Sequence, residues 1–415
     1  GLSEGRLCEV IKSSEIEDAE PVCPHFGQCG GCMYQRLSYE NQLSLKADMV
    51  KELIGRVYSD HEFEGITGSP DIYGYRNKME FTFGDECKDG PFALGLHRKE
   101  SFHDIVNIRD CALVSSDINL IRNTVRDFFN EYYIRGEIDF NHQYSHRGYL
   151  RHLLIRRSVS RNELLIALIT TTPDQCDRLD AAKEGDIISA FCDMLKGLKT
   201  EGSIVGICHV YNNALSDIVR NDSTRILFGR DYLVEDILGL SFRLSLFSFF
   251  QTNSKGAEVL YGKAREYAQE GCADRCDDKK SMIYDLYSGT GTIAQLMSPA
   301  ASGVIGIEIV EYAVKAAREN AVLNSITNVS FIAGDVMKIL CGQQKEELPR
   351  PDLIILDPPR EGIHPKALGK ILGYGVDNIV YISCKPTSLA NDLAAFKTAG
   401  YSLKKTACVD MFPMT

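Results

Sequence analysis

The chain has 415 residues, of which 44% are hydrophobic and 25% are charged, and its formal net charge is −11. This length allows two or three domains with a large buried core, and the composition excludes an intrinsically disordered or fibrous chain. The negative net charge excludes a protein coated with basic residues for non-specific binding to nucleic acid, although it leaves room for a local basic groove.

The cellular compartment is inferred from segments that the sequence lacks. No run approaches the roughly 18 to 20 apolar residues of a membrane-spanning helix, and residues 1–5 have neither the basic region nor the apolar core of a signal peptide. We therefore expect a cytoplasmic protein with no membrane partner. The 14 cysteines then predict buried thiols, metal ligands or nucleophiles rather than a disulfide framework.

The N-terminal part begins with a linker and continues into a cysteine cluster and a helix. Residues 1–20 lead into a polar, acidic stretch that is typical of a linker, and the segment CPHFGQCGGC follows it. The apolar spacing and the charges of residues 33–57 predict a long helix.

The cysteine cluster has a spacing that suits a metal site. Cys23, Cys29 and Cys32 form a C-x5-C-x2-C pattern, and Cys111 in NIRDCAL is a fourth thiol that folding could bring near them. Four thiolates suit a 4Fe–4S cluster or a zinc ion, and the spacing alone does not choose between them. It differs from the C-x3-C-x2-C motif of radical S-adenosylmethionine enzymes. A redox pair of Cys29 and Cys32 is a weaker alternative because it ignores Cys23.

Residues 65 to 230 have a mostly strand-like pattern, interrupted by the polar segment 173–200, which we expect to be helical. This pattern predicts an α+β domain. Within it, one stretch of arginines and tyrosines among strand-like apolar residues could meet phosphates and stack on bases. The stretch comprises Tyr144, Arg147, Tyr149, Arg151, Arg156, Arg157 and Arg161. A solvated strand face is the alternative interpretation.

After about residue 245, short apolar strands alternate with helical stretches. This alternation is typical of a parallel, doubly wound sheet in an α/β domain with a Rossmann-like fold. We predict an N-terminal region at 1–20, a central domain at 21–235 that carries the cysteines, and the Rossmann-like domain at 236–415. The helix at 33–57 is expected to pack on this last domain.

Three strand ends of the last domain suit a nucleoside-bearing ligand. In DLYSGTGTIA a strand runs into Gly289 and Gly291 before a helix, so the backbone can approach a ligand at the helix N-terminus. Glu308 after the next strand can accept hydrogen bonds from ribose hydroxyls, and Asp335 after the third would lie near an adenine edge. Helix capping is the alternative role of each carboxylate, and a G-x-G pattern by itself is weak.

The fourth strand ends in a rigid turn. Asp357 precedes two prolines, which fix a turn whose carbonyls and carboxylate point at whatever lies over the sheet. The segment resembles the (D/N)PP(Y/F/W) loop of base-modifying methyltransferases, with Arg360 in place of the aromatic residue.

The fifth strand ends in a cysteine. Cys384 lies beside Lys385 and before a helix start at Pro386, where positive charge and a helix N-terminus favour the thiolate. A buried structural cysteine is the alternative, but the two neighbouring loops favour a nucleophile. A thiolate here can add to C6 of a pyrimidine, whose C5 then attacks the methyl group of S-adenosylmethionine (SAM). A base removes the C5 proton, and the thiolate leaves.

Six segments together resemble one family over nearly the whole chain: FFQTN, DLYSGTGT, GIEIVEYA, DPPREG, YISCKPTSLANDL and DMFP. The family is that of the RNA 5-methyluridine methyltransferases, SAM-dependent enzymes that methylate uracil C5 in ribosomal or transfer RNA. The resemblance implies that Cys384 is the nucleophile and that Tyr287 is among the aromatic residues that hold the flipped base. It also implies that SAM is contacted by Gln251, Tyr287, Thr292, Glu308, Asp335 and Asp357.

The cysteine pattern separates branches of this family. Its ribosomal RNA branch carries an iron–sulfur cluster at this pattern, and its best-known transfer RNA branch lacks it. The resemblance therefore implies 23S ribosomal RNA as the partner and a 4Fe–4S cluster held by Cys23, Cys29, Cys32 and Cys111, with zinc and transfer RNA as the alternatives. Residues 75–84 and 147–161 also match the family's central domain, which favours RNA contact for the arginines.

Two parts of the family pattern are missing. Members usually begin with a β-barrel RNA-binding (TRAM) domain, of which residues 1–20 would be a remnant, and their proton-abstracting glutamate lies a few residues after DMFP, beyond Thr415. We therefore expect a trimmed version of a longer protein.

Other activities fit the sequence less well. A cytosine-C5 RNA methyltransferase would normally show a second cysteine in a Pro-Cys motif, and DPPR has none. A non-catalytic RNA-binding protein with a structural metal site is the alternative from another class. We expect a monomer, because no long exposed apolar stripe is evident.

Overall fold

The computed structural model of the chain describes residues 9–216, 221–273, 281–340 and 348–415, so residues 1–8 of the predicted N-terminal region lie outside the described residues. Within these ranges the α-helices are α1 (Tyr39–Gly55), α2 (Ser116–Ile134), α3 (Ala181–Lys196), α4 (Ser254–Ala273), α5 (Thr292–Met297), α6 (Glu311–Leu323), α7 (Val336–Leu340), α8 (Pro365–Gly373) and α9 (Pro386–Thr398). The strands are β1 (Glu62–Thr67), β2 (Lys78–Asp85), β3 (Phe92–His97), β4 (Ile105–Val106), β5 (Leu150–Ser158), β6 (Glu163–Thr170), β7 (Ser203–Tyr211), β8 (Ser223–Gly229), β9 (Tyr232–Ile237), β10 (Leu240–Ser245), β11 (Ser281–Leu286), β12 (Ala301–Glu308), β13 (Val329–Ala333), β14 (Leu353–Leu356), β15 (Asn378–Tyr381) and β16 (Lys405–Val409).

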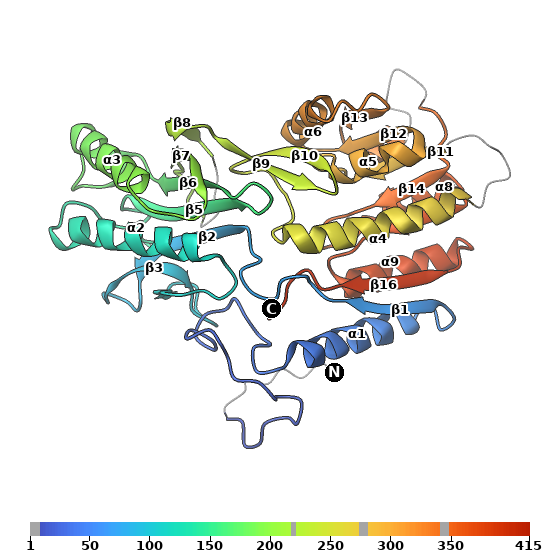
Figure 1. Ribbon diagram of the computed structural model, residues 1–415, viewed down its shortest axis with the longest axis horizontal. Coiled ribbons are helices and arrows are strands. Elements are labelled where there is room, and N and C mark those ends of the chain that lie inside the picture. Colours follow the sequence, from blue (N-terminus) through green and yellow to red (C-terminus); the bar gives the residue numbers. More distant parts are fainter. Residues whose placement is uncertain (1–8, 217–220, 274–280, 341–347) are drawn as a thin grey trace.

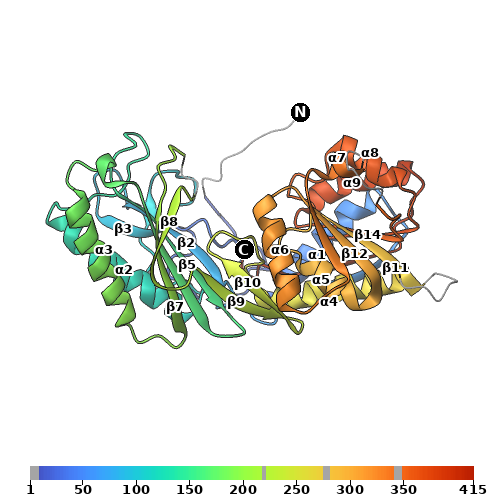
Figure 2. The ribbon, with the colours of Figure 1, turned by 90° about the horizontal axis from the view of Figure 1, so that it is seen from above.

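The chain forms two lobes, each built on one large sheet (Figure 1). The first has seven strands in the order β4-β3-β2-β5-β6-β7-β8, antiparallel except for the β6–β7 pair, and carries α2 and α3. The second has five parallel strands in the order β13-β12-β11-β14-β15 and confirms the predicted doubly wound arrangement. The β9–β10 hairpin lies between the sheets (Figure 2), and the predicted domain boundary at residue 235 falls inside β9.

The central strands β5 and β6 of the first lobe are buried on both faces, whereas the edge strand β8 is mostly exposed. Leu164 and Ile166 of β6 join the core that α2 and α3 cover, whereas Leu165 and Ala167 join the core beneath the β9–β10 hairpin. Successive residues of a strand point to opposite faces, so a strand covered on both faces is apolar at nearly every position. This burial explains the continuous apolar run of β6.

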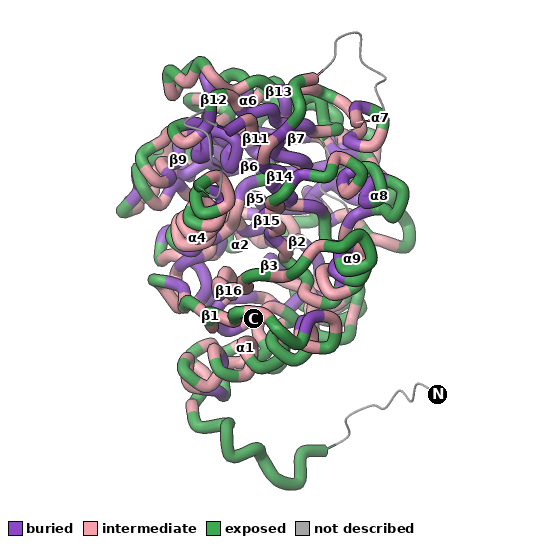
Figure 3. The backbone as a smooth tube through the Cα atoms, turned by 90° about the vertical axis from the view of Figure 1, so that its right-hand side faces the viewer, coloured by how far each residue is buried: buried purple, intermediate pink, exposed green. Residues whose placement is uncertain are grey.

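The sheet of the second lobe is also covered on both faces. Ile283 and Ile355 pack towards α4 and α5, and Tyr284 and Ile354 pack towards α1, α8 and α9. Figure 3 shows these strands buried in the interior while the helices keep exposed outer sides. A parallel sheet needs this double cover because both of its faces are apolar.

The N-terminal helix and strand belong to the second lobe. α1 packs against α9, and β1 pairs in parallel with β16 near the end of the chain. The helix begins at Tyr39, later than predicted, because the Ser38 hydroxyl accepts a hydrogen bond from the Asn41 N–H (3.4 Å) as an N-cap. The preceding residues turn instead, and the N–H groups of Met33 and Tyr34 donate to the Met414 carbonyl.

One long helix was missing from the sequence prediction. Residues 116–134 were included in a strand-like region, but they form α2. Ile118, Ile121, Val125 and Phe129 are all buried at helical spacing, so the signal was present in the sequence. The helix predicted within 173–200 is present as α3. None of the helices in the described ranges combines the length and the apolar composition needed to span a membrane.

The prediction that the arginines and tyrosines of residues 144–161 face RNA is wrong for Arg151, Arg156 and Tyr149. Arg151 and Arg156 are 5% and 2% exposed, and Tyr149 is fully buried with its hydroxyl donating to Glu184 (2.7 Å). Because β5 is covered on both faces, these long side chains reach backbone carbonyls instead of solvent. Arg151 donates to the carbonyls of Asn212, Ala214 and Ser216. The more exposed Arg147 and Arg161 form ion pairs with Asp177 and Asp236.

Arg156 also donates three hydrogen bonds, to the carbonyl oxygens of Ser245 (2.5 Å), Leu246 (3.3 Å) and Ser248 (2.9 Å). We expect Arg156→Met to lower the free energy of unfolding by about 2 to 4 kcal/mol, because buried carbonyls lose a charged donor. Arg157→Met, which removes only a contact with Asn162, should cost less than about 1 kcal/mol. Urea unfolding of both variants checks this, and equal losses would contradict the bracing role of Arg156.

Candidate active site

The carboxyl ends of the parallel strands bring the predicted site residues to one edge of the second sheet. Leu286 pairs with Ile307 and Leu356, and Leu356 pairs with Tyr381, so the loops that follow these strands are neighbours. They carry Tyr287, Glu308, Asp335, Asp357 and Cys384. From β11 the chain continues to β12 on one side, while β14 pairs with β11 on the other side, so the strand order reverses at β11. Sheets of this type bind ligands at the carboxyl ends of the strands where the order reverses.

The glycine loop after β11 has a backbone that few side chains permit. Tyr287, Gly289 and Gly291 all have positive φ angles, of 68°, 52° and 74°. A Cβ on Gly291 would lie 2.5 Å from the Phe331 ring, so only glycine fits at the start of α5. The turn is closed by its own backbone, because the N–H groups of Tyr287 and Ser288 donate to the Ile307 carbonyl and that of Gly291 donates to the Ser288 carbonyl.

Glu308 and Asp335, the carboxylates predicted at the next two strand ends, form hydrogen bonds with the backbone and fix its position. Glu308 accepts hydrogen bonds from the N–H groups of Gly289 (3.0 Å) and Val310 (2.9 Å). Asp335 accepts one from the N–H of Lys338 (3.0 Å) and so caps α7, as the capping alternative predicted. Since a carboxylate has about four acceptor sites, both side chains keep capacity for ligand hydroxyls or amines.

The fully buried Asp285 and the half-buried Asp357 form an acidic pair at the same edge. Burial raises the pKa of Asp357 to about 7, and burial followed by the charge of Asp357 raises the pKa of Asp285 well above its usual range. One oxygen of Asp285 accepts from the Ala294 N–H (2.9 Å), and the other has no hydrogen-bond partner among the described residues. Closely spaced carboxyl groups without cations suit a positively charged ligand.

Gln251 reaches the same place from the loop before α4. Its side chain bonds with Tyr261, whose hydroxyl is buried and lies near Asp357, so burial and that negative charge raise the pKa of Tyr261. The backbone carbonyl of Gln251 accepts a hydrogen bond from the Asn77 side chain (3.0 Å). Thr292 is buried as the first residue of α5.

Cys384 is exposed, which excludes the alternative of a buried structural cysteine. It lies between the end of β15 and Pro386, the first residue of α9. The turn is closed by hydrogen bonds of Ser383 Oγ with the N–H (3.2 Å) and carbonyl (3.1 Å) of Lys385. The thiol is therefore displayed on a fixed turn beside the Asp357 loop.

Two residues of α9 that the sequence analysis missed tie the cysteine turn to the Pro-Pro loop. Asp392 accepts hydrogen bonds from the Ile363 N–H (2.9 Å) and the Tyr381 hydroxyl (2.6 Å), and Ser388 donates to the Arg360 carbonyl (2.8 Å). Ser388 and Asp392 are four residues apart and lie on one helix face. Polar side chains on a buried helix face are the sequence signal by which these two residues could have been recognised. We assign them a positioning role.

Tyr287 is half-buried at this edge, and its role in holding a flipped base stays a prediction. Its side chain packs partly against the core of the second lobe, and burial, followed by the charges of Asp335 and Asp392, raises its pKa to about 12. Its hydroxyl is therefore neutral at physiological pH.

The four predicted metal ligands are in the first lobe and line one cavity of about 510 Å³. Cys23, Cys29, Cys32 and Cys111 lie close enough for the thiols to influence each other, and burial, followed by these neighbours, raises the pKa of Cys111 to about 11. Among the described residues, no group of three or more histidine, cysteine, aspartate or glutamate side chains is arranged to hold a metal ion. The metal site stays a prediction.

A five-stranded parallel sheet with a glycine loop and acidic residues at successive strand ends defines the class of SAM-dependent methyltransferases. The Pyrococcus abyssi tRNA (uracil-54, C5)-methyltransferase in complex with S-adenosyl-L-homocysteine shares this fold, with a TM-score of 0.71 and 24% identity over 98% of this chain and 86% of that one. Residues 210–415 match the family described as tRNA (Uracil-5-)-methyltransferase.

Relatives match over the full chain. An uncharacterized RNA methyltransferase of Caldanaerobacter subterraneus is 45% identical over 100% of this chain and 86% of its own length, and one of Clostridium acetobutylicum is 44% identical over 99% and 85%. The chain belongs to the RNA uracil-5-methyltransferase family and is a SAM-dependent RNA methyltransferase. This membership favours an enzyme over the non-catalytic RNA-binding alternative.

In SAM-free protein we expect Asp357→Asn to raise the free energy of unfolding at pH 8 and to leave it unchanged near pH 4. An aspartate ordinarily ionises at 3.8, whereas burial raises the pKa of Asp357 to about 7. Between these values the folded protein keeps a proton that the unfolded chain releases, so the stability of the wild type falls as pH rises. The difference should reach about 2 to 4 kcal/mol above pH 7.

Urea unfolding from pH 4 to 8 measures this difference. Asp377→Asn is the matched control because Asp377 is exposed. A difference between the wild type and Asp357→Asn that stays constant over this range would contradict the assignment.

Proposed function

We propose that this enzyme methylates C5 of a uracil in 23S ribosomal RNA, with Cys384 as the nucleophile. The observation that carries the proposal is the exposed Cys384 on a fixed turn beside the Asp357 loop, at the edge of the sheet where the glycine loop also ends. A nucleophile there can meet a base and a methyl donor that lie over the same edge.

The reaction needs Cys384, the uracil, SAM and a base. The Sγ of Cys384 bonds to C6 of the uracil, and the electron pair of the C5–C6 double bond moves onto C5 and the neighbouring C4 carbonyl oxygen. C5 then takes the methyl group of SAM as the bond between that methyl group and the sulfur breaks, which leaves S-adenosylhomocysteine. A base removes the C5 proton, and the thiolate leaves as the double bond re-forms.

We propose that SAM is bound at the acidic edge of the sheet. Its sulfonium and ammonium groups are cationic, and their charge would lower the raised pKa values of Asp285 and Asp357, so that ionised carboxylates would face the bound ligand. The contacting residues in this proposal are Gln251, Tyr287, Thr292, Glu308, Asp335 and Asp357.

We propose that the cysteine cavity holds a 4Fe–4S cluster, with a zinc ion as the alternative. The four cysteines that would hold either group line one cavity of about 510 Å³, and the resemblance of their spacing favours the cluster. Arg76 also lines the cavity, and its charge acts on the thiols of Cys29 and Cys32, which suits an anionic cluster. Cys23, Cys29, Cys32 and Cys111 would hold the cluster, which has no step in the methyl transfer.

Transfer RNA is the second candidate substrate. It is favoured by the description of the matching family and by the transfer RNA enzyme among the similar structures. The four cysteines favour ribosomal RNA, through the resemblance of their spacing to the ribosomal RNA branch.

We expect SAM and 5-fluorouridine-substituted 23S ribosomal RNA to trap a covalent complex with the wild type but not with Cys384→Ala. Fluorine at C5 cannot be removed as a proton, so the adduct accumulates. Denaturing gel electrophoresis measures it, with Cys87→Ala as the control because Cys87 is also exposed. Trapping of transfer RNA instead would establish the second candidate. No adduct with either RNA, in protein that binds SAM, would overturn the mechanism.

We expect protein purified without oxygen to contain iron and sulfide in the proportion of a 4Fe–4S cluster, and Cys32→Ser to lose both. Chemical iron and sulfide analysis and visible absorption measure this. Cys87→Ser, outside the cavity, should keep the full content. Zinc in place of iron in the wild type would contradict the cluster and support the alternative metal.

A further inference from the structure

Gln35 has a buried amide group with one unpaired end. The residue lies in the turn before α1 and is 2% exposed. Its Oε1 accepts a hydrogen bond from the Cys23 N–H (2.9 Å), and because a backbone N–H can only donate, this bond fixes which end of the amide is Nε2. The Nε2 group has no hydrogen-bond partner in the part of the chain that the structure describes. A buried donor without a partner is costly and needs an explanation.

The unpaired donor lies at the cysteine cavity. Gln35 lines this cavity together with the four cysteines. Burial raises the pKa of the Cys32 thiol to about 11, and the Gln35 amide acts against this rise, so the amide lies beside that sulfur. The sulfur of Cys29 already accepts a hydrogen bond from the Gly31 N–H (3.3 Å). Two N–H groups are therefore directed at sulfur in this cavity, and that of Gln35 is unused.

Sulfur is the acceptor that suits this donor. Arg76 and Lys78 also line the cavity, but they are cations without an acceptor atom, and the carboxylate of Glu80 pairs with Lys78 (2.9 Å). A neutral thiol is a weak acceptor, whereas a thiolate bound to a metal carries negative charge and accepts strongly. The donor of Gln35 is therefore matched to Cys32 in its metal-bound form.

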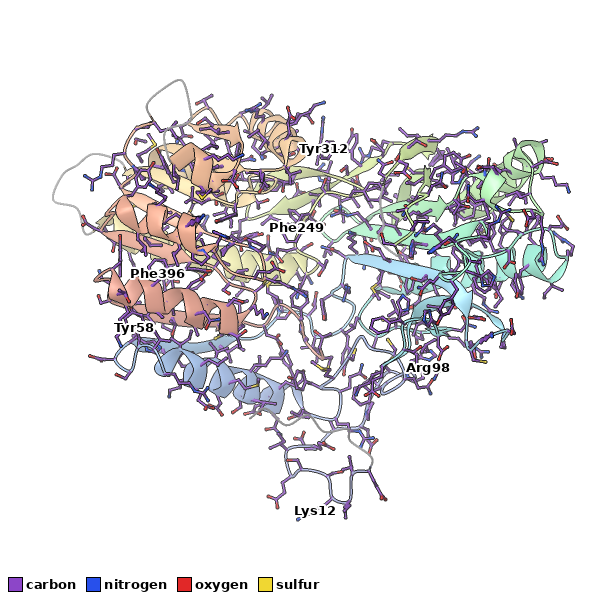
Figure 4. The ribbon with its side chains drawn as sticks, turned by 180° about the vertical axis from the view of Figure 1, so that it is seen from behind. Lys12, Tyr58, Arg98, Phe249, Tyr312 and Phe396 are labelled. Atoms are coloured by element: carbon purple, nitrogen blue, oxygen red, sulfur yellow. The ribbon has the colours of Figure 1, made fainter. Side chains whose placement is uncertain are left out.

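The cavity lies away from the proposed nucleophile. Figure 4 labels Arg98, which pairs with Cys29 in an isolated β-bridge, in the first lobe, and Phe396 of α9 in the second lobe. α9 begins directly after the Cys384 turn. A hydrogen bond at the cavity therefore acts on the metal group and has no step in the methyl transfer, so the two can be measured separately.

We propose that the Gln35 side chain donates an N–H···S hydrogen bond to the sulfur of Cys32 when the four cysteines hold their metal group. The proposal rests on the metal site of the proposed function, and it applies to a 4Fe–4S cluster and to zinc alike. The bond stabilises negative charge on the sulfur and fixes the orientation of Cys32. For a 4Fe–4S cluster, such bonds favour the reduced, more negative form and so raise the reduction potential.

The reduction potential of the cluster tests the hydrogen bond. We expect Gln35→Leu, which removes the donor without adding charge, to shift the equilibrium about 10-fold towards the oxidised form, a potential about 59 mV lower for one electron. Gln28→Leu is the matched control, because Gln28 is exposed in the same loop and should keep the wild-type potential. Redox titration followed by visible absorption, in protein purified without oxygen, measures these potentials. A wild-type potential in Gln35→Leu would overturn the proposal.

A second variant separates the donor from the packing of Gln35. Gln35→Glu keeps the shape of the side chain and an acceptor for the Cys23 N–H, but an ionised carboxylate cannot donate. We expect a lower potential here too, while Gln28→Glu, which adds the same charge at an exposed position, should match the wild type. Equal potentials of the wild type and Gln35→Glu would overturn the hydrogen bond even if Gln35→Leu did not fold.

Metal release extends the test to zinc. We expect EDTA to remove the metal from Gln35→Leu about 10-fold faster than from the wild type, because loss of a partner that orients a metal ligand weakens metal binding. In a zinc-containing protein, equal release from Gln35→Leu, Gln28→Leu and the wild type would overturn the proposal. A wild type that contains neither metal overturns the metal site itself, whereas a metal-containing wild type with unaffected variants overturns the role of Gln35 alone.

Discussion

The parallel pairing of β11, β14 and β15 is the constraint on which the rest of the site depends. It aligns Leu286, Leu356 and Tyr381, so that the loops after three strands separated by long stretches of sequence end at one edge. Each of these strands pairs with at least one parallel neighbour, and helices cover both faces of the sheet. The loops are left free to carry chemistry, which is why the glycine turn, the Asp357 turn and Cys384 meet there.

Buried polar side chains then fix those loops. Arg156 and Asn77 each bind two or more groups of a neighbouring loop, and Asp392 joins Ile363 of the Pro-Pro loop to Tyr381 of β15. All three are largely shielded from solvent. Burying such groups is costly unless every bond is made, so they hold a unique geometry when they are satisfied. The first lobe contributes Arg156 and Asn77, so it shapes the active site of the second lobe as well as carrying the cysteines.

The cysteine cavity and the SAM edge share one segment of chain. Thr252 lines the cavity, and Gln251, the residue before it, bonds with Tyr261 near Asp357. Asn77 binds both carbonyls, while its neighbours Arg76 and Lys78 also line the cavity. The two sites are therefore braced by the same backbone, although they lie in different lobes. A group bound by the four cysteines would stabilise the loop that carries Gln251 and Thr252.

The sequence by itself determined the doubly wound sheet, the glycine turn and the exposed-turn position of Cys384, because strand periodicity and turn residues are local. Only the tertiary structure decided which side chains meet solvent. Arg151 and Arg156 matched a basic patch, yet a strand covered on both faces buries them. Asp392 was overlooked because its role depends on contacts with distant segments, and local periodicity carries no record of those contacts.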